Sequence, residues 1–297
     1  MRLGIAVPTY LQHGHREGIV RVALKAEELG YDSIWVPDHV VAGDEFLTRM
    51  GPTWFEPFVT LSYLAALTHR IKLGLAVLVV PYRHPVFTAK LVSTLDQLSS
   101  GRVILGVGSG HLPVEFRALG LPLEERGPMT DEFLTVLKQL WQGGPREFHG
   151  RFCDIPAVTL DPSPYQRPHP PIWVGGNGKA SMRRAAQHGD GWHPLRLSPS
   201  ALAKGVASMR DCEARYQRSS PVTISLQSEF VRFTDRPLGD DRPSLNGTPD
   251  QVAEDMRAYA EAGLDHIALR FGMAQDTDEL ISGMERFAEV IRPALAG

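Results

Sequence analysis

The chain has 297 residues, of which 43% are hydrophobic and 22% are charged, and its formal net charge at neutral pH is -3. This length and apolar content suit one α/β barrel of about 250 residues with insertions. The near-neutral charge argues against nucleic acid or an anionic membrane as the main partner, and two distant cysteines, Cys153 and Cys212, argue against a disulfide framework or a cysteine-based zinc site.

The chain contains no run of about 18 apolar residues that would predict a membrane span. Its first apolar run, Leu3–Val7, is broken by Pro8 and is too short for the core of a signal peptide. We therefore expect a soluble protein of the reducing cytoplasm.

Short apolar runs recur along the chain and predict buried strands. Each is rich in Val, Ile, Leu or Trp and is bounded by Gly, Pro or charged residues. The expected strands are Leu3–Val7, Ser33–Val36, Lys72–Val80, Val103–Val107, Ile172–Val174, Asp190–His193, Val222–Val231 and His266–Arg270.

A helical pattern follows every one of these strands. The clearest cases are Pro57–Leu67, the stripe from Phe133 to Trp141, and the helix that Thr248 and Pro249 open as N-cap and first residue. Strict alternation predicts parallel strands with crossover helices, and eight such units favour a closed (β/α)8 TIM barrel.

A doubly wound sheet is the alternative to the barrel. It gains no support from Gly106, Gly108 and Gly110, because their spacing lacks the third glycine of the dinucleotide-binding fingerprint.

Two segments lie outside the alternation. Residues 108–127 show little periodicity and are expected to form a loop. Residues 143–171 change to a hairpin-like stretch, Phe148–Phe152, followed by several prolines. This second segment is too short to hold its own core, so we interpret it as an insertion before strand five within a single domain, 1–297.

Asp38 and His39 directly follow the second strand, where Pro37 ends it. Residues at the carboxyl ends of parallel strands carry the chemistry in α/β sheets and barrels. A turn or helix cap is the commoner role for such residues, and these two alone favour it. In a barrel, however, one mouth would collect several ionisable or polar groups: Asp38, His39, His84, Ser109, His111 and His193.

Four histidines in one mouth raise the question of a metal. Metal-dependent hydrolase barrels usually carry a His-x-His pair after strand one, where this chain has Pro8-Thr9-Tyr10, and no carboxylate accompanies the later histidines at ligand-like spacing. We assign no metal ligand and keep a metal-dependent hydrolase as a minor alternative.

Two glycine-rich turns follow strands. Gly175, Gly176, Asn177 and Gly178 open a helix, whose free N–H groups would bind an anion, although a tight turn explains them equally well. The turn Gly108-Ser109-Gly110 would likewise let a ligand approach the backbone, or it is only a turn.

Taken together, these stretches resemble the bacterial luciferase-like monooxygenase family, and more narrowly its deazaflavin-dependent branch. The resemblance extends over nearly the whole chain, and it rests on the order and spacing of several motifs. The motifs are Ser33-Ile34-Trp35-Val36-Pro37-Asp38-His39, Pro81-Tyr82-Arg83-His84-Pro85, Leu95-Asp96, Gly101-Arg102-Val103, Leu105-Gly106-Val107-Gly108-Ser109-Gly110, residues 166–176 and Gly189-Asp190-Gly191-Trp192.

The resemblance implies a flavin or deazaflavin at the carboxyl mouth of the barrel. It also implies a non-proline cis peptide at a bulge in strand three, which maps to Ala76-Val77 and would support the middle ring of the cofactor. By the same resemblance Asp38 touches the ring or its 8-hydroxyl edge, and His39 lies near the reacting carbon. The phosphate of the cofactor tail maps to Gly175, Gly176 and Asn177.

One position departs from the sugar-phosphate dehydrogenases of this branch. They carry a catalytic Glu after the Gly-x-Gly of strand four, where this chain has His111. The departure speaks against that particular reaction, although His111 can still move protons near neutral pH.

The expected activity is hydride transfer between coenzyme F-420 and a small organic substrate, with a homodimer implied by the resemblance. One alternative is an FMN-dependent monooxygenase that works with a separate flavin reductase. Another, from a different class, is a non-catalytic flavin-binding barrel, since fold does not fix function. The substrate pocket would be shaped by residues 10–15, residues 43–55 and the loop after Gly110.

Overall fold

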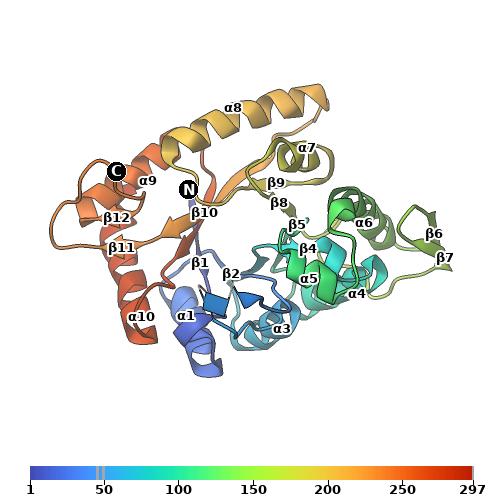
Figure 1. The fold of residues 1–297 in the computed structure, drawn as a ribbon, viewed down its shortest axis with the longest axis horizontal. Coiled ribbons are helices and arrows are strands. Elements are labelled where there is room, and N and C mark those ends of the chain that lie inside the picture. Colours follow the sequence, from blue (N-terminus) through green and yellow to red (C-terminus); the bar gives the residue numbers. More distant parts are fainter. Residues whose placement is uncertain (45–46, 49–50, 296–297) are drawn as a thin grey trace.

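The computed structural model describes residues 1–44, 47–48 and 51–295. Its centre is a closed ring of parallel strands in the order β3-β2-β1-β13-β10-β9-β8-β5, closed by the pairing of Leu73 with Val103 (Figure 1). The ring strands are β1 (Arg2–Ala6), β2 (Ser33–Val36), β3 (Lys72–Leu75) with its continuation β4 (Leu78–Val79), β5 (Val103–Gly108), β8 (Ile172–Gly175), β9 (Gly191–His193), β10 (Thr223–Phe230) and β13 (His266–Arg270).

Helices surround the ring and cover its outer face (Figure 1). They are α1 (Arg16–Glu28), α3 (Pro57–Leu67), α4 (Pro85–Leu98), α6 (Arg126–Trp141), α7 (Lys179–His188), α8 (Pro199–Arg215), α9 (Pro249–Glu261) and α10 (Thr277–Arg286), which continues into a π-helical turn, Phe287–Ile291. The structure confirms the predicted (β/α)8 barrel and rules out the doubly wound alternative, because the sheet closes on itself.

The helix starts follow the sequence closely. The helices α3, α4, α8 and α9 each begin with proline, whose missing N–H has no intrahelical partner to lose. Thr248 and Gln251 form a capping box at the start of α9, as the sequence indicates for Thr248.

Two tryptophans fill the inside of the ring. Trp35 and Trp173 stack with ring centroids 5.2 Å apart. A Cβ atom added at Gly74 would overlap the Trp35 ring, and one at Gly191 would lie 2.5 Å from Trp173 Cδ1. The interior is therefore a packed core in which glycine on one strand makes room for tryptophan on another.

Strand three is shorter than predicted. The expected continuous strand Lys72–Val80 is interrupted after Leu75 and resumes only as β4, and Val80 begins a 3-10 turn, Val80–Tyr82. The interruption falls on the peptide between Ala76 and Val77, which is cis, as the family resemblance predicts.

The prediction of an irregular loop over residues 108–127 was wrong. It contains the helix α5 (Pro113–Ala118) and a 3-10 turn, Leu123–Glu125, and α6 already begins at Arg126. Six residues are too few to show a helical period in the sequence, which is why α5 escaped the pattern analysis.

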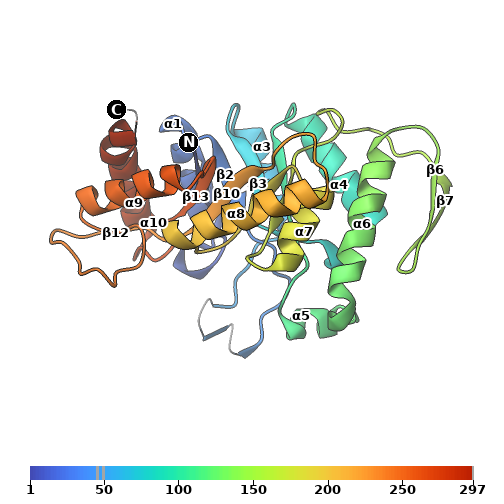
Figure 2. The ribbon, with the colours of Figure 1, turned by 90° about the horizontal axis from the view of Figure 1, so that it is seen from above.

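The segment predicted as an insertion carries an antiparallel hairpin that stands outside the ring of strands (Figure 2). Its strands are β6 (Arg146–His149) and β7 (Asp154–Val158). The carboxylate of Glu132 on α6 accepts hydrogen bonds from the backbone N–H groups of residues 151–153 at 2.8–3.0 Å, and so fixes the hairpin turn.

Two short strands that the sequence did not indicate, β11 (Arg232–Phe233) and β12 (Asn246–Gly247), pair in parallel next to the end of β10. Among the helices of the described residues, none has both the length and the apolar sequence that a membrane span requires.

Candidate active site

The residues that follow β2, β5 and β8 lie at one end of the barrel, because all ring strands run parallel. Seen from above, the segment after β2 and the helix α5 after β5 project from the same side of the molecule (Figure 2). The predicted convergence of Asp38, Ser109 and Gly176 on one mouth is thus met by the topology.

Asp38 forms a buried ion pair directly below this mouth. Its carboxylate is 0% exposed and binds the Arg83 guanidinium at two points, 2.7 and 2.9 Å. It also accepts the backbone N–H of Val79 at 2.9 Å. Asp38 therefore holds β4 and the turn after it in place next to the Ala76-Val77 peptide.

Arg83 is charged under all ordinary conditions. Burial lowers its pKa, but the carboxylates of Asp38 and Glu56 outweigh this effect and leave the pKa above its usual value. The Arg83–Glu56 contact, at 2.9 Å, extends the pair to the start of α3.

His39 pairs with a carboxylate that comes from α5. Its Nδ1 lies 3.3 Å from each oxygen of Glu115, whose side chain is only 1% exposed. The indole of Trp54 packs edge-on against the imidazole at 4.5 Å between ring centroids. The carboxylate thereby fixes the orientation of the imidazole ring.

Glu115 is satisfied by three donors. Besides His39, it accepts the Tyr82 hydroxyl at 2.7 Å and the Val40 N–H at 2.8 Å. Burial raises the pKa of Glu115, but hydrogen bonds from His39, Tyr82 and Val40 outweigh it, so the pKa lies below its usual value. Burial and the same carboxylate raise the pKa of Tyr82, which stays protonated.

His111 lies on the rim close to this pair. Loss of hydration, with a further contribution from the nearby His39, lowers the pKa of the His111 imidazole below its usual value. His111 is therefore mainly neutral at pH 7 and able to accept a proton.

The side chain of Val77 occupies a notch between two glycines of neighbouring strands. A Cβ atom at Gly108 would lie 2.6 Å from Val77 Cγ2, and one at Gly175 would lie 2.6 Å from Val77 Cγ1. These residues come from three different strand ends, and the notch brings together Ala76, Val77, Gly108 and Gly175 from the predicted cofactor set. The two glycines make room for the Val77 side chain, so a flat ring at this place would rest against Val77.

The rest of the β8–α7 turn is tied down and open to solvent. Asn177 exchanges two hydrogen bonds with the backbone of Leu195, both 2.9 Å. The Gly176 carbonyl accepts from Trp192 Nε1 and Ser181 Oγ. Gly178 has no side chain to cap α7, and its carbonyl already accepts the N–H of Ser181, so an anion would meet the N–H groups of Lys179 and Ala180.

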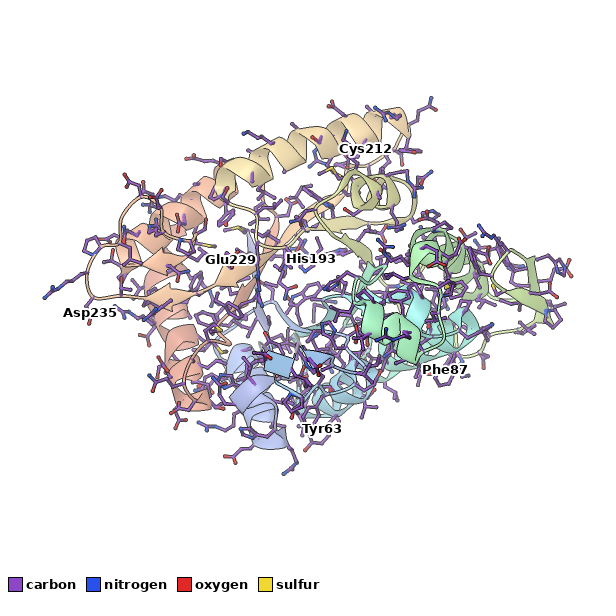
Figure 3. All side chains as sticks on the ribbon, in the orientation of Figure 1. Tyr63, Phe87, His193, Cys212, Glu229 and Asp235 are labelled. Atoms are coloured by element: carbon purple, nitrogen blue, oxygen red, sulfur yellow. The ribbon has the colours of Figure 1, made fainter. Side chains whose placement is uncertain are left out.

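Two of the histidines expected in the mouth lie elsewhere. His84 caps α4 and lines a groove between α4, α6 and the hairpin, outside the barrel. His193 is buried inside the ring, where it hydrogen bonds Ser225 at 2.7 Å (Figure 3). Alternation on β9 turns His193 inward, and His84 is the N-cap of α4, which lies outside the ring of strands.

From the sequence we did not single out Glu115, Tyr82 or Trp54 as site residues, although we expected the loop after Gly110 and residues 43–55 to shape the substrate pocket. Pro113 followed by an acidic residue two places on is a helix-start signal that could have pointed to α5, and hence to Glu115. No sequence signal brings Trp54 to His39. Within the described residues, no group of three or more metal-ligating side chains is found.

A cofactor with a planar ring and an anionic tail fits these residues. The ring can rest against Val77, which fills the notch, and the start of α7 can receive a phosphate. The His39–Glu115 pair then supplies a proton-transfer group at the same mouth.

Comparison with known proteins agrees with this geometry. A family model described as luciferase-like monooxygenase matches residues 1–235. An uncharacterised protein of Mycobacterium tuberculosis is 33% identical over 223 residues, which cover 70% of this chain and 76% of that protein.

Two characterised relatives differ in their cofactor. The F420-dependent glucose-6-phosphate dehydrogenase of Amycolatopsis mediterranei is 27% identical over 300 residues, 94% of this chain and 86% of that enzyme. The FMNH(2)-dependent dimethylsulfone monooxygenase of Pseudomonas putida is 39% identical over 139 residues, 46% of this chain and 38% of that enzyme. The solved structure of an F420-dependent secondary alcohol dehydrogenase superposes with a TM-score of 0.80 over 99% of this chain and 98% of its own, at 19% identity, which speaks to the fold alone.

Proposed function

The chain belongs to the luciferase-like monooxygenase family, whose members are flavin- or deazaflavin-dependent enzymes, and we propose that it is an F-420-dependent oxidoreductase acting on a small organic substrate. The observation that carries the proposal is the glycine-walled notch around Val77 at the same barrel mouth as the His39–Glu115 pair. The preference for deazaflavin rests on the dehydrogenase that matches along 94% of the chain.

When bound, the deazaflavin supplies a ring carbon that exchanges a hydride with the substrate. We assign the ring to Ala76, Val77 and residues 108–110, and the phosphate of the tail to residues 175–178. In this assignment Asp38 acts through its hydrogen bonds with Val79 and Arg83, which position the segment 79–83 below the ring.

We assign the proton transfer to His39. Glu115 orients its imidazole, which would take a proton from a substrate hydroxyl or give one to a substrate carbonyl oxygen. His111 is the second candidate for this part, because it stands neutral beside His39. Trp54 keeps water from one side of the imidazole.

Spectral titration of the purified protein with F-420 and with FMN tests the proposal. We expect F-420 to bind in the low micromolar range or tighter, and Asp38→Asn to weaken it at least tenfold, because the segment under the ring loses its anchor. Tight binding of FMN with no binding of F-420 would overturn the assignment.

That outcome would support the second candidate, an FMN-dependent monooxygenase that receives reduced flavin from a separate reductase. The relative that is 39% identical over 139 residues favours it. Oxygen consumption on addition of a flavin reductase and FMN would then distinguish a monooxygenase from a dehydrogenase.

We also propose a homodimer formed through the outer faces of α3 and α4. Their exposed apolar side chains include Val59 (71% exposed), Tyr63, Phe87 (60%) and Leu98 (74%), and Tyr63 and Phe87 both stand at the periphery (Figure 3). Light scattering should give twice the chain mass for the native protein and the single mass for Phe87→Glu. The control Met273→Glu, at a residue 64% exposed elsewhere, should remain a dimer.

A further inference from the structure

A buried arginine without an anionic partner stands at the barrel mouth. Arg270 is the last residue of β13, and only 6% of it is exposed. His266 and Ala268 on the same strand face the ring interior, where they meet Ser33 and Trp35, so alternation turns Arg270 inward as well. Its Nε and Nη1 are buried and have no hydrogen-bond partner.

The other buried arginines of the described residues are satisfied. Arg102, 8% exposed, donates to the carbonyl groups of Ser99, Ile71 and Ala65. Arg184, 4% exposed, pairs with Asp131 at 2.6 Å. A buried charge without such partners costs several kcal/mol, so folding alone gives no reason for arginine at 270.

The surroundings of Arg270 are suited to an anion. Its guanidinium stacks 3.9 Å from the centre of the Phe230 ring, and Arg196 stands over the same ring at 5.7 Å. One carboxylate, Glu229, faces Arg196 at 3.7 Å. Two guanidinium groups against one carboxylate leave one positive charge in excess. Burial lowers the pKa of Arg270, as expected for a charge that lacks compensation.

Aromatic rings connect this charge to the proton-transfer group. The Tyr10 hydroxyl interacts with Arg270, and the Tyr10 ring stacks on Trp54 at 4.6 Å between centroids. Trp54 in turn packs against His39 at 4.5 Å. A ligand lying along the Tyr10 and Trp54 rings would have one end at Arg270 and the other at His39.

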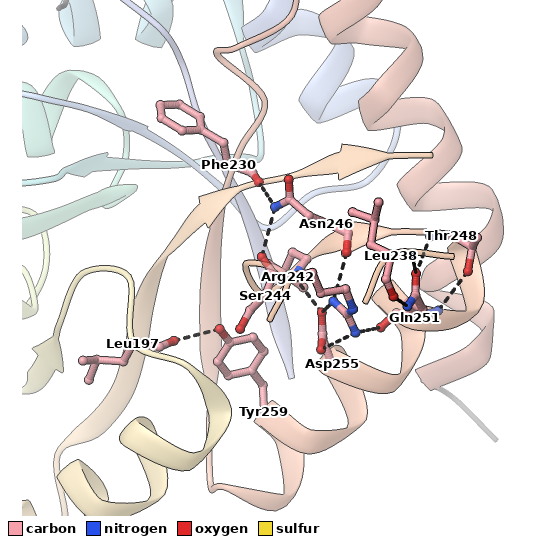
Figure 4. Close-up of polar contacts among 11 residues, drawn as sticks. Leu197, Phe230, Leu238, Arg242, Ser244, Asn246, Thr248, Gln251, Asp255 and Tyr259 are labelled. Atoms are coloured by element: carbon pink, nitrogen blue, oxygen red, sulfur yellow. Dashed lines mark hydrogen bonds and ion pairs between the residues drawn. The ribbon is translucent and has the colours of Figure 1, made fainter. Parts of the chain in front are cut away.

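The segment that carries Phe230 is fixed by a hydrogen bond and an ion pair. Asn246 of β12 donates through Nδ2 to the Phe230 carbonyl at 2.7 Å, and the Phe230 ring points away from the polar contacts that join this segment to α9 (Figure 4). Arg242 of the same segment pairs with Asp255 of α9. The stacking face for Arg270 is thus preorganised by the protein.

We propose that Arg270 binds an anionic group of the substrate, a carboxylate, phosphate or sulfonate, while the reacting carbon lies near His39. The substrate and not the cofactor is the source of this anion, because β13 stands opposite β5 in the closed ring, across the mouth from the Val77 notch. The inference rests on the proposed function only for the place of the ring.

Calorimetric titration of the F-420-loaded protein with inorganic phosphate, at an ionic strength held constant with sodium chloride, tests the proposal. We expect phosphate to bind the native protein and Arg270→Met to weaken it at least about tenfold, because charge-assisted hydrogen bonds are lost. The control Arg210→Met removes an exposed charge at the opposite end of the barrel and should bind phosphate like the native protein.

Thermal unfolding gives a second, independent result. Arg270→Met should melt at the native temperature or above it, because the change removes two buried N–H groups that have no hydrogen-bond partner. Arg102→Met should melt lower, because it loses the hydrogen bonds from Arg102 to three carbonyl groups. A loss of folding in Arg270→Met would assign Arg270 to the fold and overturn the inference.

The remaining outcomes separate this inference from the proposed function. Equal phosphate binding by the native protein and Arg270→Met, with F-420 bound, would refute the anion site alone. Phosphate binding that depends on Arg270 but disappears when F-420 is bound would assign the site to the cofactor tail, against our inference. If the protein does not bind F-420 but its phosphate binding depends on Arg270, only the assignment of the cofactor is refuted.

Discussion

Glu115 is the side chain on which the candidate catalytic group depends, since one carboxylate receives His39, Tyr82 and the Val40 N–H. In Glu115→Gln one of the two oxygens becomes an N–H group that faces another donor. We expect a loss of about 1–3 kcal/mol in the free energy of unfolding at pH 7, measured by urea denaturation.

The loss in the free energy of unfolding of Glu115→Gln should depend on pH. The pKa of Glu115 is depressed in the folded protein, so its contribution is complete above the unfolded value of about 4.3 and disappears as the pH falls through the folded value. The gap between Glu115→Gln and the native protein should therefore narrow below about pH 4. The exposed control Glu124→Gln should show no gap, and an equal loss in both variants would contradict the role of Glu115.

Asp38 and His39 could be predicted from the sequence because their position depends only on where a strand ends. Their partners could not be predicted this way. Arg83 and Glu115 lie 45 and 76 residues further along the chain, and a contact over that separation is set by the closure of the ring. The family pattern pointed to a carboxylate at position 111, but the structure supplies one from α5.

The Val77 notch explains why two strand ends carry glycine. Gly108→Ala would place a Cβ atom 2.6 Å from Val77 Cγ2, and overpacking of this kind costs about 1–3 kcal/mol. Thermal unfolding should show a lower melting temperature for Gly108→Ala and partial recovery in Gly108→Ala/Val77→Ala, which removes the clashing methyl groups. Gly178→Ala, with nothing within 4 Å of its new Cβ atom, is the matched control. Equal melting temperatures for Gly108→Ala and Gly178→Ala would show that Gly108 is not needed to make room for Val77.

Helices and strands were predictable where hydrophobic period and end signals agreed. The helix Pro57–Leu67 and the strands Ser33–Val36 and His266–Arg270 have the predicted bounds. Strand three failed because its apolar run continues through the cis peptide, and composition does not record a backbone irregularity. The short α5 was not predicted because one and a half turns are too short to show a helical period in the sequence.

The barrel as a whole should lose stability in mild acid. His193 and His266 share Ser225 inside the ring, and burial lowers the pKa of His193 to about 3 and that of His266 well below its usual value. The unfolded chain therefore binds more protons than the folded one below about pH 6.5, and the free energy of unfolding falls as the pH falls.

Each such histidine contributes a slope of about 1.4 kcal/mol per pH unit well below pH 6.5. Urea denaturation between pH 6 and 4 should show a slope that is smaller by about this amount in His193→Gln, since all other groups titrate alike in both proteins. Parallel pH profiles of the two proteins would mean that His193 is protonated inside the folded barrel.

The closed ring was the most predictable feature of the molecule, because eight alternating units have few ways to bury parallel strands. The predicted barrel also determines which strands face each other across the mouth. The eighth strand, β13, stands opposite the fourth, β5, and this separates the Arg270 site from the Val77 notch.

The central claim is that a deazaflavin lies against the glycine-walled notch at the barrel mouth. The most direct measurement is the dissociation constant of F-420 for the native protein, Gly175→Ala and Gly239→Ala, determined side by side by fluorescence. We predict low micromolar binding for the native protein and for Gly239→Ala, whose new Cβ atom has nothing within 4 Å, and binding at least tenfold weaker for Gly175→Ala, whose Cβ atom would displace Val77. The same affinity in all three proteins, or no binding by the native protein, would contradict the account.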